Sequence, residues 1–346
     1  MRRNAKFGAV RVKPTLCLIS MLVPVGLCGM APEEIAVTRP DPEGVPTQVR
    51  IAPYVIDIGT IDNAQQQFSI DLVLSLEWKD ARLAGPRARR LPLQQVWHPQ
   101  AYLFNQRNVR TFLPELVDVG TDGTVFYTQR YYGNLGALLD LRAFPFDRQS
   151  LPITVVSFAY SPDEVQFVLE ARYAGRAERF SNADWDIGQG TGTVSRYRAV
   201  AGHAAGQEHF YSRFDYVLPA KRYLSYYVWK VIGPLVIIVL MSWAVFYIDP
   251  SLLGPQLGLA GTSILTLIAF LFSLRGILPP ISYLTRLDYF VYASLVLVFV
   301  AFLEALSSGF LSAQGRHETA KSLDRVSRIA FPFCFIAVNV WFWFLG

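Results

Sequence analysis

The hydrophobic pattern of the chain changes once, near residue 223. From Tyr54 to about Lys221, apolar and polar residues alternate in short runs such as Phe68–Trp78 and Leu151–Tyr160. A period of two is typical of strands that bury one face. Turn residues separate the runs, and no helical pattern intervenes. We therefore predict an antiparallel β-sandwich here.

Four long apolar runs follow the predicted sandwich. They are Tyr226–Tyr247, Gln256–Leu278, Leu287–Phe310 and roughly Val326–Leu345. Each is long enough to cross the hydrocarbon core of a bilayer as a helix. The fold class that we predict is an extracellular all-β, immunoglobulin-like sandwich followed by a four-helix transmembrane bundle.

Basic residues orient this bundle. The connection between the third and fourth runs carries Arg316, Lys321, Arg325 and Arg328. Clustered basic residues beside a span favour the cytoplasmic side of a membrane. We therefore expect the sandwich on the outer side.

The N-terminal residues 1–31 are predicted to be a signal peptide. A basic start precedes the apolar run Thr15–Gly29, which is too short for a comfortable span. The predicted domains are then 32–222 for the sandwich and 223–346 for the bundle. The cysteines are Cys17, Cys28 and Cys334, so we expect no disulfide in the sandwich.

Composition and motifs exclude several functions. The net charge of +5 is modest, and no Lys/Arg run accompanies it, so we expect no nucleic-acid partner. The four histidines are scattered along the chain, and we find no nucleophile motif or phosphate loop. We expect no metal site, no cofactor and no enzymatic activity.

The second apolar run carries an unusual stripe. At about 100° per residue, one face holds small or polar residues and two bulky ones. These residues are Gly258, Thr262, Leu265, Ala269, Phe272 and Gly276. In one interpretation, the small residues let a neighbouring helix approach closely. In the other, several copies surround a pore, with a hydroxyl ring at Thr262 and apolar constrictions at Leu265 and Phe272.

Short motifs occur in a specific order along the chain. The sequence FPFDRQ occupies Phe144–Gln149. The other motifs are Trp78-Lys79-Asp80, Trp97-His98-Pro99-Gln100 with Asn105, Arg222, Pro234, Pro279-Pro280 and Leu287-Asp288. In this order they resemble the pentameric ligand-gated ion channels, the Cys-loop receptor family. Ala137 and Leu151 stand where the family has paired cysteines, which is the pattern of its bacterial branch.

The resemblance implies a homopentamer that binds a small-molecule agonist or protons and passes ions across the bacterial inner membrane. The ligand site of the family lies between adjacent extracellular domains, within aromatic side chains. By motif register, the ligand-binding residues are Phe104, Phe158, Tyr160 and Tyr211. Such a box suits an ammonium group or an apolar ligand. Two departures count against an amine, because Phe158 replaces a common Trp and Val73 replaces a common aromatic residue.

The resemblance also favours the pore interpretation of the stripe. The pore-lining residues are then Gly258, Thr262, Leu265, Ala269 and Phe272. Ion selectivity stays open, because Pro255, Gly258 and Arg275 resemble an anion channel whereas Asp249 offers a negative ring. A rival function is a non-conducting, membrane-anchored extracellular ligand sensor.

Four residues are expected to couple the sandwich to the helices: Asp62, Asp147, Arg222 and Pro279. Asp147 and Arg222 belong to elements that should meet at the membrane boundary, where they would form a partly desolvated ion pair. The alternative is a solvated Asp and an Arg whose charged head reaches into water. Pro234 is expected to kink the first helix. Trp78 and Trp97 are expected to be core residues.

Overall fold

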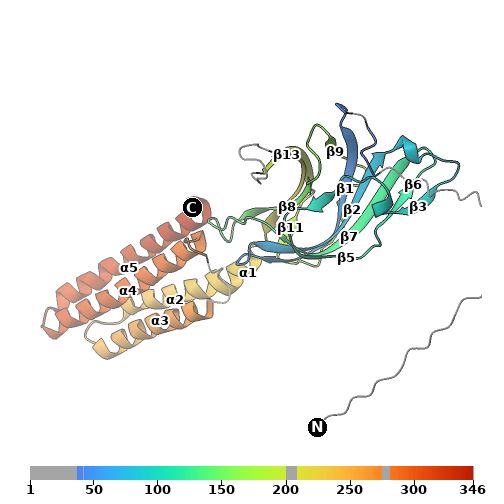
Figure 1. The fold of residues 1–346 in the computed structure, drawn as a ribbon. Helices are drawn as coiled ribbons and strands as arrows, with labels where there is room; N and C mark the ends of the chain where they lie inside the picture. Colours follow the sequence, from blue (N-terminus) through green and yellow to red (C-terminus); the bar gives the residue numbers. More distant parts are fainter. Residues whose placement is uncertain (1–36, 42, 200–208, 275–280, 346) are drawn as a thin grey trace, which may run out of the picture. The chain divides into compact units, whose positions relative to one another are not determined.

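The computed structural model describes residues 37–41, 43–199, 209–274 and 281–345 (Figure 1). The predicted signal peptide, Arg275 and Pro279 lie outside these ranges. Within them, the chain forms a two-sheet sandwich followed by helices. The predicted fold class is confirmed.

The sandwich has one large and one small sheet (Figure 1). The large sheet contains β1 (Thr47–Asp62), β2 (Gln67–Lys79), β3 (Arg89–Pro92), β5 (Gln106–Thr111), β6 (Leu116–Val119), β7 (Thr124–Gly136), β9 (Val165–Leu169) and β10 (Gly175–Arg176). Its order is β10-β1-β2-β7-β6-β3, with β5 paired to β7 and β9 to β1. The small sheet contains β4 (Ala101–Leu103), β8 (Arg148–Ser157), β11 (Trp185–Ile187), β12 (Thr191–Ala199) and β13 (His209–Arg222). Its order is β11-β13-β8-β4, with β12 paired to β13.

Alternation along β2 explains how the sheets pack. The inward-facing residues, each at most 4% exposed, are Phe68, Ile70, Leu72, Leu74 and Leu76. The residues between them face outward, as the strand period requires. Trp78 and Trp97 are 2% and 1% exposed, and their rings meet edge to face at 6.0 Å. The prediction that both tryptophans belong to the core is confirmed.

Strand β1 begins at Thr47, earlier than the alternation predicted, and it contains Pro53. One neighbour, β9, pairs with β1 in parallel as far as Ile51, and the other, β10, pairs in parallel from Tyr54. Pro53 lies in the gap between them. Proline has no N–H to donate to a neighbouring strand, and between the ends of β9 and β10 no neighbouring strand requires that hydrogen bond. The sequence analysis predicted a wholly antiparallel sandwich. The parallel pairing of β9 and β10 with β1 shows that this prediction is wrong for these two strands.

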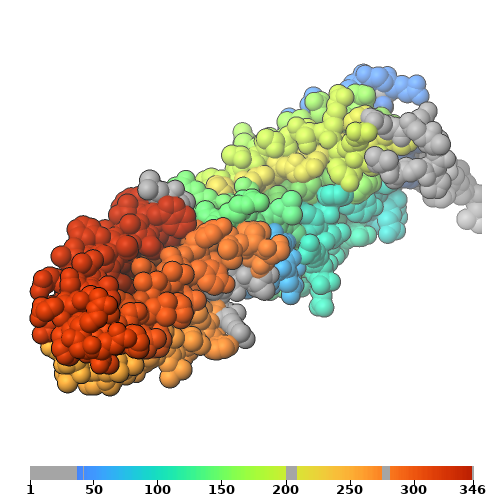
Figure 2. Space-filling view, turned by 90° about the vertical axis from the view of Figure 1, so that its left-hand side faces the viewer, coloured from blue at the N-terminus to red at the C-terminus, as the bar shows by residue number. Residues whose placement is uncertain are grey.

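Four helices are long and apolar enough to cross a membrane: Ser225–Tyr247, Leu253–Leu274, Arg286–Ala313 and His317–Phe344. The first is built from α1 (Ser225–Tyr227), a π-helical turn (Val228–Ile232), α2 (Gly233–Ala244) and a 3-10 turn (Val245–Tyr247). The second is α3 (Leu253–Leu274) and the third is α4 (Arg286–Ala313). The fourth is α5 (His317–Val340), followed by a π-helical turn (Trp341–Leu345). In Figure 2, α4 in orange and α5 in red lie side by side.

The fourth helix begins at His317, not near Val326 as predicted from hydropathy. Lys321, Arg325 and Arg328 therefore lie on a helix and not in a connecting loop. Their segment is amphipathic, because Ala320 and Asp324 are buried while Lys321 and Arg325 are exposed. The narrow buried face of this segment leaves most of its residues polar. Hydropathy therefore did not predict that the helix begins there.

The structure accommodates Pro234 with a π-helical turn. Proline has no N–H to donate to the carbonyl of the residue four before it, and its ring crowds that carbonyl. The preceding turn, Val228–Ile232, widens, and the N–H of Gly233 bonds to the carbonyl of Val228. A π-helical turn is one recognised way for a helix to absorb such a defect.

Two acids face each other inside the bundle, the half-buried Glu304 on α4 and Asp324 on α5. Asp324 is fully buried, and no donor among the described residues hydrogen-bonds the carboxylate oxygens of either residue. We expect Glu304→Gln to raise the free energy of unfolding by about 1–3 kcal/mol, because its amide supplies the missing donor. Thermal denaturation at pH 8 measures the change. The exposed Glu318→Gln is the control, and a lower stability for Glu304→Gln would contradict the prediction.

Candidate functional site

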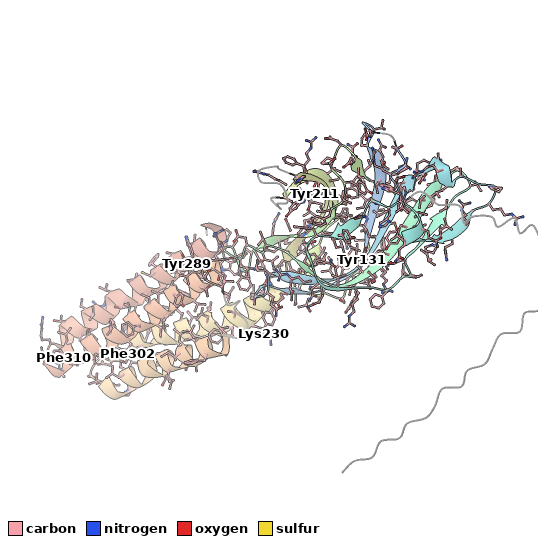
Figure 3. All side chains as sticks on the ribbon, viewed as in Figure 1. Tyr131, Tyr211, Lys230, Tyr289, Phe302 and Phe310 are labelled. Atoms are coloured by element: carbon pink, nitrogen blue, oxygen red, sulfur yellow. The ribbon has the colours of Figure 1, made fainter. Side chains whose placement is uncertain are left out.

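Three of the four predicted ligand-binding residues lie together on the small sheet. Phe104 follows β4 and Phe158 follows β8. Tyr211 lies on β13, where Figure 3 labels it. Ring centroids are 6.0 Å apart between Phe104 and Phe158, and 5.6 Å apart between Phe158 and Tyr211. The N–H of Phe104 bonds the carbonyl of Thr154, which ties the loop after β4 to β8.

Tyr197 completes this group. It pairs with Tyr211 across β12 and β13, and its ring lies 4.7 Å from Phe104 and 6.3 Å from Phe158. We call Phe104, Phe158, Tyr197 and Tyr211 the aromatic cluster. The sequence analysis missed Tyr197, because its position depends on the register of the β12–β13 hairpin. The sequence feature that could have indicated Tyr197 is its position between Arg196 and Arg198, because such alternation is typical of a strand.

Tyr160 does not join the aromatic cluster. Its hydroxyl accepts a hydrogen bond from Nε1 of Trp97 at 2.7 Å, and the two rings lie 5.5 Å apart. The residue is thereby tied to the core tryptophan. Phe104 and Phe158 are instead 41% and 40% exposed. The aromatic cluster is therefore an open face of a single chain, able to contact a second surface.

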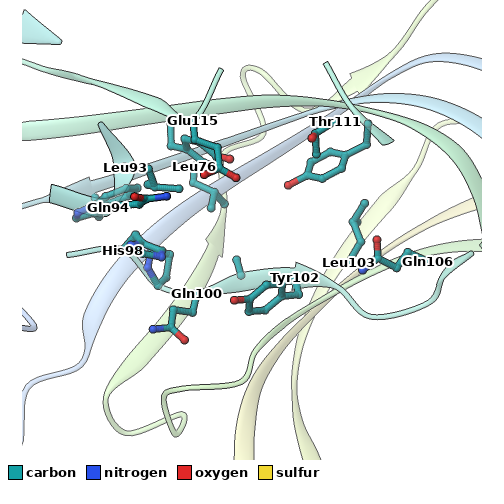
Figure 4. Close-up of a pocket in the computed structure, with 15 residues that line it drawn as sticks. Leu76, Leu93, Gln94, His98, Gln100, Tyr102, Leu103, Gln106, Thr111 and Glu115 are labelled. Carbon is teal, nitrogen blue, oxygen red and sulfur yellow. The ribbon is translucent and has the colours of Figure 1, made fainter. Parts of the chain in front are cut away.

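A separate cavity of about 430 Å³ lies within the sandwich (Figure 4). Polar side chains including Gln94, His98, Gln100 and Glu115 line it. Burial, followed by the charges of Tyr127 and then Glu115, raises the pKa of the Tyr131 phenol. Tyr102 lines the cavity and also lies 6.3 Å from Phe158. The aromatic cluster itself does not line this cavity.

Asp147 and Arg222 form a buried, two-pronged ion pair where the sandwich meets the helices. The guanidinium Nε donates to Oδ1 at 2.8 Å, and Nη2 donates to Oδ2 at 3.0 Å. The side chains are 5% and 1% exposed for Arg222 and Asp147. Gln149 donates a further hydrogen bond to Asp147. Charge-assisted bonds of this geometry are strong and directional.

Aromatic rings enclose the other faces of the Arg222 guanidinium. Its central carbon lies 4.0 Å from the ring centroid of Trp185, 4.9 Å from Phe144 and 5.9 Å from Tyr227. The planar guanidinium can stack on such faces. The role of Trp185 was not predicted, because β11 pairs it directly with Arg222 from a distant part of the sequence. We call Asp147, Arg222, Trp185 and Phe144 the junction cluster.

The β1–β2 turn reaches the junction cluster through Asn63 and not through Asp62. Oδ1 of Asn63 lies 3.3 Å from Nη2 of Arg222. The carboxylate of Asp62 instead accepts hydrogen bonds from the N–H groups of Ala64 and Gln65. Asp62 therefore shapes the turn that presents Asn63.

The FPFDRQ loop also contacts the start of α4. The N–H of Leu287 bonds the carbonyl of Phe144 at 3.1 Å, and the N–H of Leu141 bonds the hydroxyl of Tyr283 at 3.0 Å. The first turn of α4 is fixed by a capping box between Thr285 and Asp288. These hydrogen bonds tie the FPFDRQ loop and the residues just before it to α4 and to the segment that precedes α4.

The five predicted pore-lining residues of α3 are all exposed in the single chain. Leu265 and Phe272 are 68% and 57% exposed, and Gly258, Thr262 and Ala269 are also exposed. Apart from the adjacent residues and the backbone of its own helix, no atom of the described residues lies within 4 Å of the position that a Cβ at Gly258 would take. The buried face of α3 consists of Gln256, Ala260, Ser263, Leu267 and Leu274. The stripe and the buried face of α3 therefore consist of different residues.

Asp249 lies in the turn before α3. Ser251 donates backbone and side-chain hydrogen bonds to its carboxylate, and these lower the pKa of Asp249. Nζ of Lys321 lies 4.0 Å away and partly offsets its charge. Pro255 is the third residue of α3, which begins three residues before the predicted start.

Comparisons with known proteins identify the family. The sequence profile of the neurotransmitter-gated ion-channel ligand binding domain matches residues 36–209. The profile of the neurotransmitter-gated ion-channel transmembrane region matches residues 231–315. The chain belongs to this family of pentameric ligand-gated ion channels. The family consists of ion channels and not of enzymes.

Similar proteins come from bacteria and animals. A proton-gated ion channel of Gloeobacter violaceus is 26% identical over 329 residues, which cover 92% of this chain and 90% of that protein. The gamma-aminobutyric acid receptor subunit beta-4 of Gallus gallus is 25% identical over 84% of this chain. The glycine receptor subunit beta of Rattus norvegicus is 25% identical over 77% of this chain. The matches span 61% and 55% of those two receptor subunits.

Proposed function

We propose that the chain forms a homopentameric ion channel of the bacterial inner membrane. The sandwich is extracellular or periplasmic, and α3 of each copy lines the pore. The observation that carries the proposal is the exposed stripe of α3, on which Leu265 and Phe272 are 68% and 57% exposed in the single chain. Five such stripes around an axis would leave the rings of Leu265 and Phe272 as apolar constrictions, which close a pore by dewetting.

The agonist site lies between the aromatic cluster of one copy and the large sheet of the next. Support comes from a hollow of about 350 Å³ on the outer face of β2 and β7, lined by Phe126, Glu170 and Tyr173. Ser75 also lines it and lies two residues from Val73, the residue expected to face the ligand. Val73 is not aromatic, but Phe126 and Tyr173 are 46% and 61% exposed nearby.

The charges of this hollow favour a cationic agonist. Glu77 is paired with Arg50 at 3.1 Å, whereas Glu170 has no ion pair among the described residues. An unpaired, half-buried carboxylate opposite an aromatic cluster suits an ammonium group. A small amine is therefore the agonist class that we propose, and protons are the alternative stimulus.

We expect Phe158→Ala to raise the concentration of propylammonium needed for half-maximal current by roughly tenfold, through loss of a cation–π contact. Concentration–response recordings in planar bilayers measure this. The matched control is Phe210→Ala, because Phe210 is also 40% exposed but lies next to Tyr211 on the opposite face of β13. Equal shifts in both variants would remove the aromatic cluster from the agonist site.

Agonist binding is transmitted through the junction cluster. Asp147 and Arg222 connect β8 and β13 to the first helix, and Asn63 brings in the β1–β2 turn. The loop of Phe144 passes the motion to α4. Pro279 keeps its proposed coupling role, and Asp62 acts by shaping the turn.

A reversal potential tests the proposed function. The purified protein is reconstituted in a planar bilayer under a KCl gradient, and amines, carboxylates and pH are scanned for current. Reversal near the chloride potential supports selection by Pro255, Gly258 and Arg275. Reversal near the potassium potential assigns selectivity to Asp249 or backbone dipoles. Silence under all conditions, also in a Leu265→Ser variant, would favour the non-conducting sensor.

A further inference from the structure

One charged residue on the outside of the bundle has no role in the proposed channel mechanism. Lys230 is the single charged residue in the first membrane-spanning helix, Ser225–Tyr247. It lies in the π-helical turn, its side chain is exposed, and no described residue pairs with its ammonium group. Figure 3 shows it at the end of this helix that adjoins the sandwich. An ionisable residue in a membrane-spanning helix raises the free energy of the protein in the bilayer unless a group of opposite charge or a polar group pairs with it.

The residues around Lys230 have the profile of a membrane interface. Tyr226 and Trp229 are 47% and 77% exposed. Such aromatic side chains gather where the headgroups meet the hydrocarbon. Further along the same helix, Ile237 and Leu240 are 67% and 46% exposed and purely apolar. Lys230 lies about 8 Å along the helix from Ser225, so its flexible stem can return the ammonium to headgroup level.

We propose that Lys230, with Tyr226 and Trp229, binds the phosphate of an anionic phospholipid in the outer leaflet. The acyl chains then lie along Ile237 and Leu240. The inference requires only that the bundle crosses a membrane, and it goes beyond the proposed channel function.

A carboxylate on the helices of a second copy would be the other partner for this ammonium. Acidic residues on the described helices are Asp288, Glu304, Glu318 and Asp324. Asp288 is held by Thr285 in the capping box. Glu304 lies about 27 Å along α4 from its start beside the sandwich, and Glu318 and Asp324 lie at the opposite end of the bundle from that start. None of these is a free carboxylate at the level of Lys230, which favours the lipid.

Native mass spectrometry of the full-length oligomer tests the proposal. The detergent-purified protein is titrated with dioleoylphosphatidylglycerol, and lipid binding is compared between the parent, Lys230→Gln, Lys230→Arg and the control Lys79→Gln. We expect Lys230→Gln to weaken the tightest lipid site about fivefold, the effect of one basic residue at a membrane surface. Lys230→Arg and Lys79→Gln should retain parent affinity, and inorganic phosphate should not displace the lipid.

Three results would overturn the proposal. Unchanged lipid affinity in Lys230→Gln would show that the ammonium does not contact the headgroup. Displacement by inorganic phosphate would assign the site to a soluble anion. Dissociation of the Lys230→Gln oligomer in lipid-free detergent, with parent-like lipid affinity in the intact remainder, would assign Lys230 to contact with a second copy.

Discussion

Replacing Asp147 by Asn is expected to destabilise the protein by about 3–5 kcal/mol and to abolish agonist-evoked current. The substitution leaves the guanidinium of Arg222 buried without its counter-ion, because its other contacts are the neutral Asn63, the Tyr227 hydroxyl and aromatic rings. Removal of one partner from a buried pair has a cost of this size, since it strands a charge away from water. Thermal denaturation and bilayer recordings measure the two effects separately.

A matched control for Asp147→Asn lies in the segment just before the FPFDRQ loop. Arg142 and Asp140 form a pair at 3.1 Å, but their side chains are 75% and 62% exposed. Exposed pairs contribute at most about 1 kcal/mol, so Asp140→Asn should leave both stability and current nearly unchanged. The exchanged pair Asp147→Arg with Arg222→Asp should recover part of the current that each single reversal loses. Strictly additive losses would show that the two residues act independently.

The second large effect is expected from Leu265→Ser, which should raise the resting conductance at least about tenfold. Leu265 is 68% exposed on the single chain, so in the proposed pentamer its burial depends on neighbouring copies in the closed state. Half-burial of a leucine stabilises that state by about 1 kcal/mol per subunit, and five copies act together. A hydroxyl also favours wetting of the constriction. Ion flux from liposomes without agonist measures the change.

The control for this variant is Leu306→Ser on α4. Leu306 is also exposed, at 46%, but it does not belong to the α3 stripe. Its substitution should leave the resting flux at the parent level. An unchanged flux in Leu265→Ser, from protein that folds and assembles normally, would exclude Leu265 as the gate.

The amino-acid sequence by itself determined the architecture of this protein. Alternation such as that of Phe68 to Leu76 predicted the sheets, and four apolar runs predicted the helices, because burial on one face or on all faces leaves its own periodicity. The same local geometry predicted that Trp78 and Trp97 belong to the core. It also predicted that Gly258 and Phe272 lie on one face of a helix. The motif FPFDRQ located the loop that contacts the helices.

Only the tertiary structure decided which side chains meet across long sequence distances. Trp185 reaches Arg222 because β11 pairs with β13, and Tyr197 reaches Phe104 because of the hairpin register. A shift of one residue in either pairing would turn these side chains to the opposite face. The β1–β2 turn likewise presents Asn63 instead of Asp62, since the carboxylate is used within the turn. Such contacts depend on strand pairing and turn geometry, which a local sequence pattern does not specify.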